Sequence, residues 1–401
     1  MKTVVSMILR TAMLLAFVLL CIGYYEYIAV ISAHHSATTI QQKNLRQDDI
    51  ERRLVAVSSI TLATVGDLGH YQFLYNQIVV WPGSISAAIC VQKEEKEFFQ
   101  SLLDSSLLPS RVRVSMFVAE KTTFPINELR NLAYSNSDST HVLVTDIDIL
   151  PSPSLHSTFL SLPHAILDDP HLALVVPLFE MAHYTRNCHN WFDCQSEMTI
   201  FFSLTKYDLR MCTVTQACID LGNTGVNQYS LPGWLTLPAT DAVMPYTCWA
   251  NTQQQPFVIV KKTSAVPAFY TRLQDFGKNR LEWLTHLRFS GFHFALLGQS
   301  WLYHLRHRQS SLAERYDQKK DINGKIMRIR EAELSEQYKG VWRLPLCGVS
   351  EQAYSNPYGM SVEQLLEREE REQQKSQSPA YKRDKEIMEK FAKRKKNKRK
   401  K

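Results

Sequence analysis

The chain has 401 residues, of which 45% are hydrophobic, so it can fill the core of one large globular domain or two smaller ones. Its formal net charge is +7, but nine Lys or Arg residues and no acid lie between Lys390 and Lys401, which leaves −2 for the rest of the chain. A nearly neutral body gives no electrostatic case for binding nucleic acid, so we expect no nucleic-acid partner.

The N-terminal residues predict a targeting segment. Residues 11–25 are uncharged and mostly apolar, Lys2 and Arg10 precede them, and Glu26 follows. The positive-inside bias predicts an uncleaved signal anchor with a cytosolic N-terminus, as in a single-pass type II membrane protein. A signal peptide cleaved after Gly23 is the alternative, and extraction of the full-length protein by carbonate would favour it. In both cases we expect the body of the protein in the lumen of the Golgi or the endoplasmic reticulum.

From residue 60 the hydrophobic pattern alternates between strands and helices. We predict strands at residues 60–64, 85–91, 112–118 and 141–145, and helices at residues 71–81, 94–106 and 126–135. The second helix is expected to turn Phe98, Leu102 and Leu103 to one side. This alternation predicts an α/β fold with a mostly parallel, three-layer sheet that binds ligands at the C-terminal ends of its strands.

The fourth predicted strand runs directly into two acids, in the sequence HVLVTDIDIL at residues 141–150. Alternate side chains of an extended chain share a face, so Asp146 and Asp148 project the same way. Two such carboxylates repel each other unless a cation lies between them, and a hard ion such as Mn²⁺ or Mg²⁺ fits. Pro151 is expected to block any regular ladder beyond this point. A solvated turn is the alternative to a metal site.

The second half of the chain is less regular. We predict strands at residues 173–177, 256–262, 293–297 and 301–304, a helix at residues 280–289, and a long insertion over residues 180–246. Residues 361–375 predict a solvent-exposed helix, and the charged residues beyond them predict disorder. The chain contains no Gly-rich phosphate loop, which argues against a dinucleotide oxidoreductase and a P-loop enzyme.

Seven cysteines follow the apolar segment, at positions 90, 188, 194, 212, 218, 248 and 347. In an oxidising lumen the four between residues 188 and 218 could staple a long loop, but their pairing cannot be deduced from the sequence. A zinc site that includes His183 and His189 is a less favoured alternative, because the cysteine spacings are wider than zinc sites use. An odd number leaves at least one free thiol, and Cys90 in its apolar strand is the predicted buried one.

Several segments, in a fixed order, resemble one known family. They are TLAT (61–64), WPGSIS (81–86), PINELRNLA (125–133), VTDIDILPS (144–152), ALVVPLFE (173–180), YTCWANTQQQPFVIVKK (246–262), FGKNRLEWLTHLRFSGFHFALL (276–297) and LYHLRH (302–307). Together they resemble glycosyltransferase family 49, which includes the β-1,4-glucuronyltransferase of the dystroglycan glycan and the C-terminal domain of the LARGE-type enzymes. The resemblance covers residues 61–310 and implies a GT-A fold.

The resemblance also implies a reaction. Such an enzyme binds a UDP-sugar through Mn²⁺ and transfers the sugar, with glucuronic acid favoured here, to a glycan or glycoprotein acceptor with inversion. Asp146 and Asp148 would hold the ion, with His304 or His307 as a third ligand. His307 is slightly favoured because it closes the family motif.

Donor binding is predicted for residues near these acids. Asn127, Arg130 and Asn131 lie near one side of the helix that precedes the metal strand, and Thr64 and Lys278 lie in two of the matching motifs. The guanidinium of Arg130 could pair with a phosphate or a sugar carboxylate. A structural salt bridge is the alternative for Arg130.

The catalytic base departs from the family pattern. An inverting transferase needs a carboxylate that takes the proton of the acceptor hydroxyl. Where the family has PxxYDERFxG, residues 267–277 read PAFYTRLQDFG, with Thr271 in place of the first acid. We therefore predict Asp275 as the base, with Glu282 second, and Arg306 also replaces a family proline. These changes allow a different sugar specificity, a different acceptor, or a relative that has lost activity and binds a glycan or a partner protein.

The domain organisation follows from these segments. We predict a cytosolic tail (1–10), a signal anchor or signal peptide (11–27), a stem (28–58), a GT-A domain (59–345) and a charged, disordered tail (346–401). A further alternative is an anchored binding protein whose basic tail attracts acidic glycans or phospholipids.

Overall fold

The computed structural model describes residues 58–119, 123–181, 205–275, 277–305, 311–348 and 362–377. The chain divides into two compact units, Met1–Val57 and Ser58–Lys401, and every described residue belongs to the second. The predicted cytosolic tail, anchor and nearly all of the stem therefore lie outside the described residues. Within the described ranges, no helix has the length and apolar character that crossing a membrane requires.

The first half alternates strands with helices, as predicted. Its main elements are β1 (Ile60–Asp67), α3 (Phe73–Val80), β2 (Ser84–Gln92), α4 (Lys96–Ser105), β3 (Val112–Ala119), α5 (Ile126–Ser135) and β4 (His141–Asp146). β1, β2 and β4 are buried on both faces, which explains their nearly continuous apolar sequences, whereas the edge strand β3 is mostly half-buried. All four strands and all three helices are confirmed, with shifts of a few residues at their ends.

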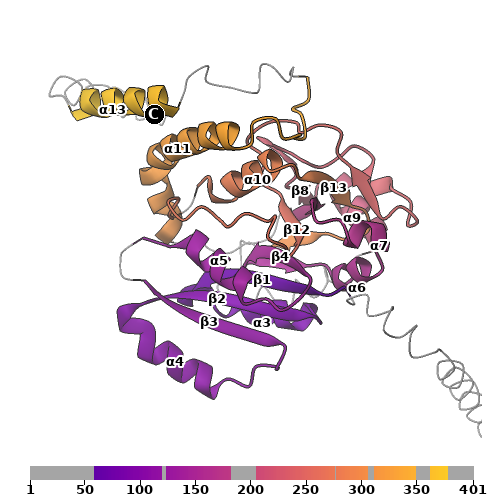
Figure 1. Ribbon diagram of the computed structural model, residues 1–401. Helices are drawn as coiled ribbons and strands as arrows, with labels where there is room; N and C mark the ends of the chain where they lie inside the picture. The colour runs from indigo at the N-terminus through magenta and orange to yellow at the C-terminus, as the bar shows by residue number, and fades with distance from the viewer. Residues whose placement is uncertain are drawn as a thin grey trace, which may run out of the picture. The chain divides into compact units, whose positions relative to one another are not determined.

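The large sheet is mixed rather than mostly parallel (Figure 1). Its eight strands have the order β11-β13-β6-β12-β4-β1-β2-β3, with β6 (Leu172–Val176), β11 (Val243–Pro245), β12 (Phe257–Lys261) and β13 (His293–Leu297). The strands β1 to β4 pair in parallel, whereas β12 is antiparallel to both β4 and β6. Helix α5 packs against β1 and β2. The predicted parallel pairing is therefore complete among β1 to β4, whereas the second half combines the parallel pair β6–β13 with antiparallel pairs of β11 and β12.

A second, smaller sheet lies beside the acidic motif. Its order is β5 (Ile149–Pro151), β14 (Leu302–His304), β7 (Leu178–Met181) and β8 (Cys218–Asp220). As expected, the ladder does not continue beyond Pro151, which is the last residue of β5 and pairs with Leu302 in an antiparallel register. Proline is tolerated there because β5 is an edge strand and Pro151 is its last residue.

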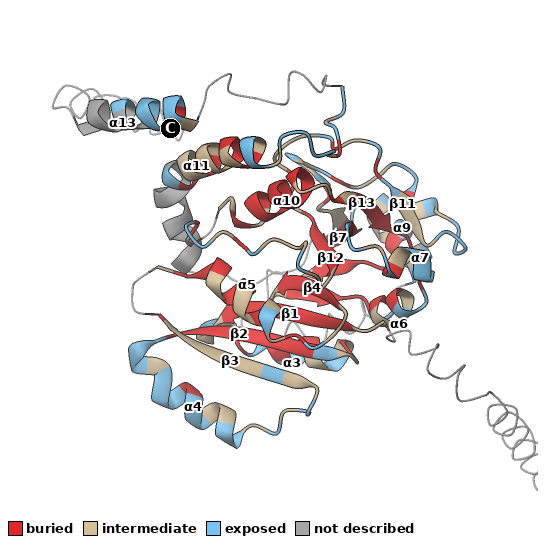
Figure 2. Ribbon diagram, viewed as in Figure 1, coloured by how far each residue is buried: buried red, intermediate tan, exposed pale blue. Residues whose placement is uncertain are grey.

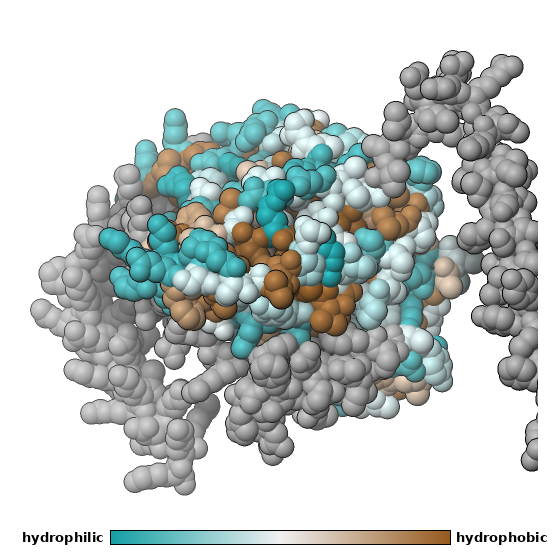
Figure 3. Space-filling model, turned by 90° about the horizontal axis from the view of Figure 1, so that it is seen from below, coloured by the Kyte–Doolittle hydropathy of each residue, from teal (hydrophilic) through white to brown (hydrophobic). Residues whose placement is uncertain are grey.

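Side-chain burial corrects the predicted face of α4. Phe99 is fully buried, whereas Phe98 is 63% exposed. Leu102 and Leu103 follow Phe99 at spacings of three and four, so these three residues share one helical face. Figure 2 shows α4 with exposed residues along much of its length, in contrast to the buried strands. Seen from below, the surface carries both hydrophobic and hydrophilic areas (Figure 3).

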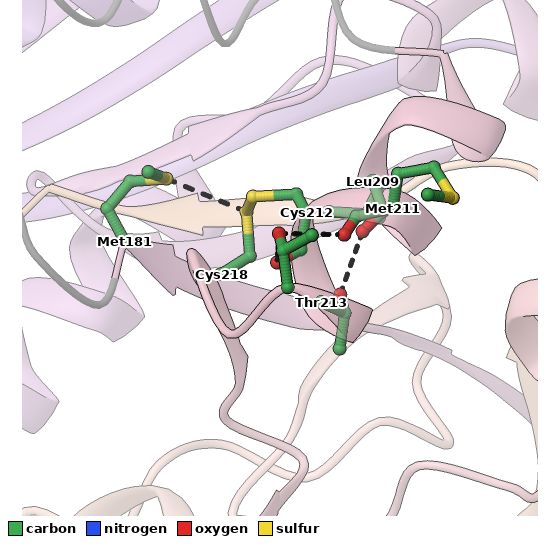
Figure 4. Close-up of a disulfide and its surroundings, with 7 residues drawn as sticks. Met181, Leu209, Met211, Cys212, Thr213 and Cys218 are labelled. Carbon is green, nitrogen blue, oxygen red and sulfur yellow. Dashed lines mark hydrogen bonds between the residues drawn. A yellow bond between two sulfur atoms is a disulfide. The ribbon is translucent and has the colours of Figure 1, made fainter.

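Two disulfides link described segments. Cys212 bonds to Cys218, which joins α9 (Lys206–Val214) to β8 beside Met181 of β7 (Figure 4), and Cys248 bonds to Cys347. Both cysteines of the first pair are thus unavailable to the alternative zinc site, whose other members lie outside the described residues. The predicted buried free thiol at Cys90 is confirmed.

The remaining helices complete the described fold. They are α6 (Leu155–Leu160), α7 (His164–Leu167), α10 (Asn279–Phe289), α11 (Ser311–Gln337) and α13 (Val362–Gln377). The predictions at residues 280–289 and 361–375 are confirmed by α10 and α13. Helix α11, which packs against α10, was not predicted.

Candidate active site

The acidic motif lies where β4 of the large sheet turns into β5 of the small one. Asp146 is the last residue of β4, and the backbone N–H of Ile147 donates to the carbonyl oxygen of Val65 on β1 at 2.9 Å. Gly66 permits this close approach, because a Cβ at that position would lie 2.7 Å from the Ile147 side chain. Both acids therefore lie at the C-terminal edge of parallel strands, as the sequence predicts.

The buried amide of Gln77 on α3 braces this turn. Its Nε2 donates to the carbonyl oxygens of Ile149 (2.9 Å) and Asp146 (3.3 Å). It also donates to the hydroxyl of Thr64 at 3.1 Å. Thr64 is fully buried, and its predicted contact with a donor stays a prediction.

Two guanidinium groups hold the carboxylate of Asp146. Arg130 Nη2 donates to Oδ1 at 2.8 Å, and Arg280 Nη2 donates to Oδ2 at 3.0 Å. Burial lowers the pKa of Arg280, and the charge of Asp146 opposes this effect. Arg130 thus makes a structural salt bridge, the alternative given above, and its predicted contact with a donor stays a prediction. The sequence did not predict a role for Arg280, although this residue lies two positions after Lys278 in a segment that resembles the family.

The other residues predicted to bind the donor hold neighbouring segments of the chain. Asn131 exchanges two hydrogen bonds with the backbone of Phe269, and Asn127 Nδ2 donates to the carbonyl oxygen of Tyr270 at 2.8 Å. Lys278 Nζ donates to Oε1 of Gln253 at 2.5 Å. The two asparagines thus fix residues 269–270 against α5. Their predicted contact with a donor stays a prediction.

Asp148 is joined to a histidine and a second acid across the small sheet. His304 Nε2 lies 3.4 Å from Oδ2 of Asp148, and His304 Nδ1 lies 2.7 Å from Oε2 of Glu180. Burial lowers the pKa of His304, but hydrogen bonds to Asp148 and Glu180 outweigh it and raise the pKa to about 10. Of the two predicted histidine ligands, His304 therefore lies at the motif, whereas His307 is outside the described residues.

Glu180 was not singled out from the sequence. It lies on β7 beside β14, and an acid that ends the apolar run ALVVPLF was the available signal. Its carboxylate fixes the orientation of the His304 ring and leaves Nε2 directed at Asp148.

The donor set at this edge suits a divalent ion. The described ranges contain no group of three or more His, Cys, Asp or Glu side chains already spaced around a metal position. However, Asp148 and His304 are a carboxylate and an imidazole within reach of each other, and Glu180 binds the second ring nitrogen. A carboxylate behind a histidine is the usual outer support of a metal-binding imidazole. Asp148 and His304 would therefore hold a divalent metal ion, with Glu180 supporting the imidazole.

The two predicted base residues lie in buried contacts. Asp275 is fully buried, and its Oδ1 accepts the backbone N–H of Phe124 at 2.6 Å. Its own backbone is left-handed, with φ of 57°. Glu282 is also fully buried and accepts from Nε of Arg330 at 3.0 Å, while burial raises its pKa to about 7. The role of each acid as the base stays a prediction.

A large sheet covered by helices, with acids at the carboxyl end of a central strand, defines an α/β protein, and proteins of this class bind ligands at such an edge. The family described as "Glycosyl-transferase for dystroglycan" matches residues 105–339, more than half of the chain. The chain belongs to this family, glycosyltransferase family 49, as a divergent member.

Individual relatives are similar at low identity. The chain is 25% identical over 299 residues to xylosyl- and glucuronyltransferase LARGE2s of Gallus gallus, which covers 70% of this chain and 37% of that protein. It is 24% identical over 229 residues to beta-1,4-glucuronyltransferase 1 of Danio rerio, which covers 55% of this chain and 49% of that protein. The chain thus spans less than half the length of these relatives.

Solved structures are similar more distantly. GalNAc-T7 with UDP, GalNAc and Mn²⁺ matches with a TM-score of 0.44 and 12% identity, over 78% of this chain and 56% of that one. S. aureus TarS in complex with UDP-GlcNAc matches with a TM-score of 0.40 and 9% identity, over 74% of this chain and 69% of that one. The family assignment rests on the sequence match.

Proposed function

We propose that the chain is an inverting, Mn²⁺-dependent glycosyltransferase of the GT-A type, which transfers a sugar from a UDP-sugar to a glycan or glycoprotein acceptor. Glucuronic acid is the favoured sugar. The observation that carries this proposal is the line of contacts from Asp148 through His304 to Glu180, at the edge where the family's metal motif ends. Family membership and the names of the relatives support the reaction class.

Different residues would bind the metal ion, orient its histidine ligand and accept the proton in this reaction. Asp148 and His304 would hold Mn²⁺ together with Asp146, and Glu180 would orient the imidazole. A bound Mn²⁺ supplies positive charge that stabilises the leaving diphosphate. The acceptor hydroxyl attacks the anomeric carbon and gives its proton to a carboxylate, for which Asp275 is our first candidate and Glu282 the second.

We also propose a site of action from the sequence. The charge pattern around residues 11–27 favours an anchor in Golgi-type membranes with the described unit in the lumen. Two described disulfides support an oxidising compartment.

One observation favours a second candidate function. Both acids that could serve as the base are fully buried and bonded to neighbouring groups. A family relative that binds a glycan or assists another transferase, without turnover of its own, would need no such base.

A donor screen tests the proposal directly. The lumenal region is incubated with each of several UDP-sugars and Mn²⁺, and the release of UDP is measured with and without acceptor glycans. We expect UDP-glucuronic acid to be used best and Asp148→Asn to abolish both transfer and Mn²⁺-dependent UDP binding, with its melting temperature retained. Asp168→Asn, which removes an equal charge from an exposed ion pair with Lys261, is the matched control. Full activity in EDTA would overturn the metal-dependent mechanism, and binding of UDP without turnover of any donor would favour the second candidate.

A further inference from the structure

Asp146 has a neighbourhood that a simple metal ligand would not need. Each of its two carboxylate oxygens already accepts a charged hydrogen bond, Oδ1 from Arg130 and Oδ2 from Arg280. Hydrogen bonds between guanidinium and carboxylate groups are among the stronger ones in proteins. The single negative charge of Asp146 therefore interacts with two positively charged guanidinium groups. Both groups repel a divalent cation that approaches Asp146.

The two arginines are held differently. The side chain of Arg130 is 4% exposed, lies over the Phe269 ring, and is also bonded to Oδ1 of Asn127, which itself anchors the chain at Tyr270. Arg130 is therefore a fixed part of α5 and its surroundings.

Arg280 is the more accessible of the two. Its side chain is 21% exposed, and its guanidinium lies 3.6 Å from the centre of the Phe257 ring. Its Nη1 donates to the backbone carbonyl oxygen of Gln255 at 3.1 Å. These two contacts hold the guanidinium beside Asp146 but do not depend on Asp146. The group can therefore exchange its anionic partner while it keeps its place on the ring.

We propose that Arg280 is an exchangeable latch on Asp146, an inference that rests on the proposed function. Without a donor, Arg280 holds Oδ2 of Asp146 and makes this acid a poor metal ligand. When a UDP-sugar binds, an anionic oxygen of its diphosphate takes over the Nη2 donor of Arg280. The planar guanidinium is suited to such an exchange, because carboxylate and phosphate oxygens fit the same fork of donors. Oδ2 is then released toward the metal ion.

The latch couples two binding events. The donor removes a guanidinium from a metal ligand, so donor binding strengthens metal binding beyond the direct contact between metal and diphosphate. Coupling of this kind is reciprocal, so the ion alone and the nucleotide alone should each bind more weakly than they would without the latch. Metal and donor then bind together rather than one by one.

Mn²⁺ binding without nucleotide tests the latch apart from activity. Mn²⁺ affinity is measured by titration calorimetry on the wild type, Arg280→Gln and Arg113→Gln; the last removes one positive charge from an exposed ion pair with Asp138. We expect Arg280→Gln to bind Mn²⁺ about tenfold more tightly without nucleotide, the scale of one charged hydrogen bond. In the presence of Mn²⁺ it should bind UDP about tenfold more weakly. Arg113→Gln should match the wild type in both measurements.

A second variant tests the same latch from its other side. Asp146→Asn removes the charge that holds Arg280, so in EDTA it should bind UDP more tightly than the wild type does. This variant covers the case in which Arg280→Gln fails to fold, which thermal unfolding would reveal. The latch is overturned if Arg280→Gln binds Mn²⁺ no more tightly than the wild type, or if Asp146→Asn gains no affinity for UDP in EDTA. A wild type that binds no UDP even with Mn²⁺ would instead refute the proposed function.

Discussion

Single side chains fix the segment that carries the predicted base. The amides of Asn127 and Asn131 bond to the backbone of residues 269–270, and Asp275 bonds to the backbone of Phe124 in both directions. These contacts join the segment after β12 to the start of α5. A substitution of Asp275 can therefore lower turnover because the base is lost or because this contact between segments is lost. The two effects can be separated by experiment.

Asp275→Asn is expected to lower turnover by about a hundredfold, the usual scale for the loss of a general base. UDP affinity should hardly change, because the variant leaves the contacts of Asp146 and Asp148 intact. The asparagine keeps an oxygen that can accept the N–H of Phe124, so we expect the melting temperature to remain within a few degrees of the wild type. Turnover, UDP affinity and thermal unfolding check this. A melting temperature that falls together with turnover would assign Asp275 to the bridge instead.

The sequence identified part of this site for a physical reason. Asp146 ends the buried strand β4, so the apolar run in the sequence located both acids; the extended chain that was expected through Asp148 stops at Asp146, and Asp148 lies in the turn before β5. The contacts of Arg280 with Asp146 and of Glu180 with His304 join residues 134 and 124 positions apart. No local pattern encodes such pairs, so the residues that set the charge of the site became visible only in the fold.

At the scale of elements, two short strands decide the geometry around the predicted metal ligands. β14 carries His304 and β7 carries Glu180, and these strands pair in parallel within the small sheet. The sequence predicted β14 because its apolar residues are contiguous. It missed β7 and β8, which lie in or beside a region of weak periodicity. β8 is held to α9 by the Cys212–Cys218 disulfide and pairs with β7.

The Cys248–Cys347 disulfide should contribute more stability than the Cys212–Cys218 disulfide. It closes a loop with a sequence separation of 99, compared with 6 for the other pair. Loop-closure entropy then predicts that replacing both cysteines with alanine lowers the free energy of unfolding by about 4.7 kcal/mol for the long loop and about 2 kcal/mol for the short one. Urea unfolding of the two double variants, without reductant, measures both losses. Equal losses would contradict the entropic explanation.

At the scale of the whole described unit, helix α10 lies in the interior. Nearly every residue of α10 is buried, and α11 packs against it (Figure 2). Because α10 is buried on nearly all sides, its sequence has no polar face from which its orientation could be predicted. The sequence of α11 is rich in polar residues, so it did not predict that α11 packs against α10. The contact contains a charged cluster in which Arg330 of α11 bonds to Glu282 and His286 of α10.

This cluster predicts a pH dependence of stability that can be assigned to Glu282. Burial raises its pKa from 4.5 to about 7, and the hydrogen bond from Arg330 only partly opposes this. Between pH 4.5 and 7 the folded protein keeps a proton that the unfolded chain releases. The stabilisation from this group is therefore fully present below pH 4.5 and is lost as the pH rises to 7. The loss amounts to about 3 kcal/mol, from 1.36 kcal/mol per pKa unit.

Glu282→Gln should remove this loss, because the amide does not titrate and its oxygen can still accept from Arg330. Burial lowers the pKa of the neighbouring His286 to about 4, which gives stability the opposite slope between pH 4 and 6.5, so only the difference between variant and wild type isolates Glu282. Urea unfolding at pH 5 and pH 7.5 gives this difference. Glu333→Gln removes a neighbouring negative charge that contributes a smaller part of the raised pKa of Glu282, so it should reduce the loss of stability without removing it. If Glu282→Gln loses as much stability between the two pH values as the wild type, Glu282 is ionised in the folded protein throughout this range, and its ion pair with Arg330 is stronger than its burial.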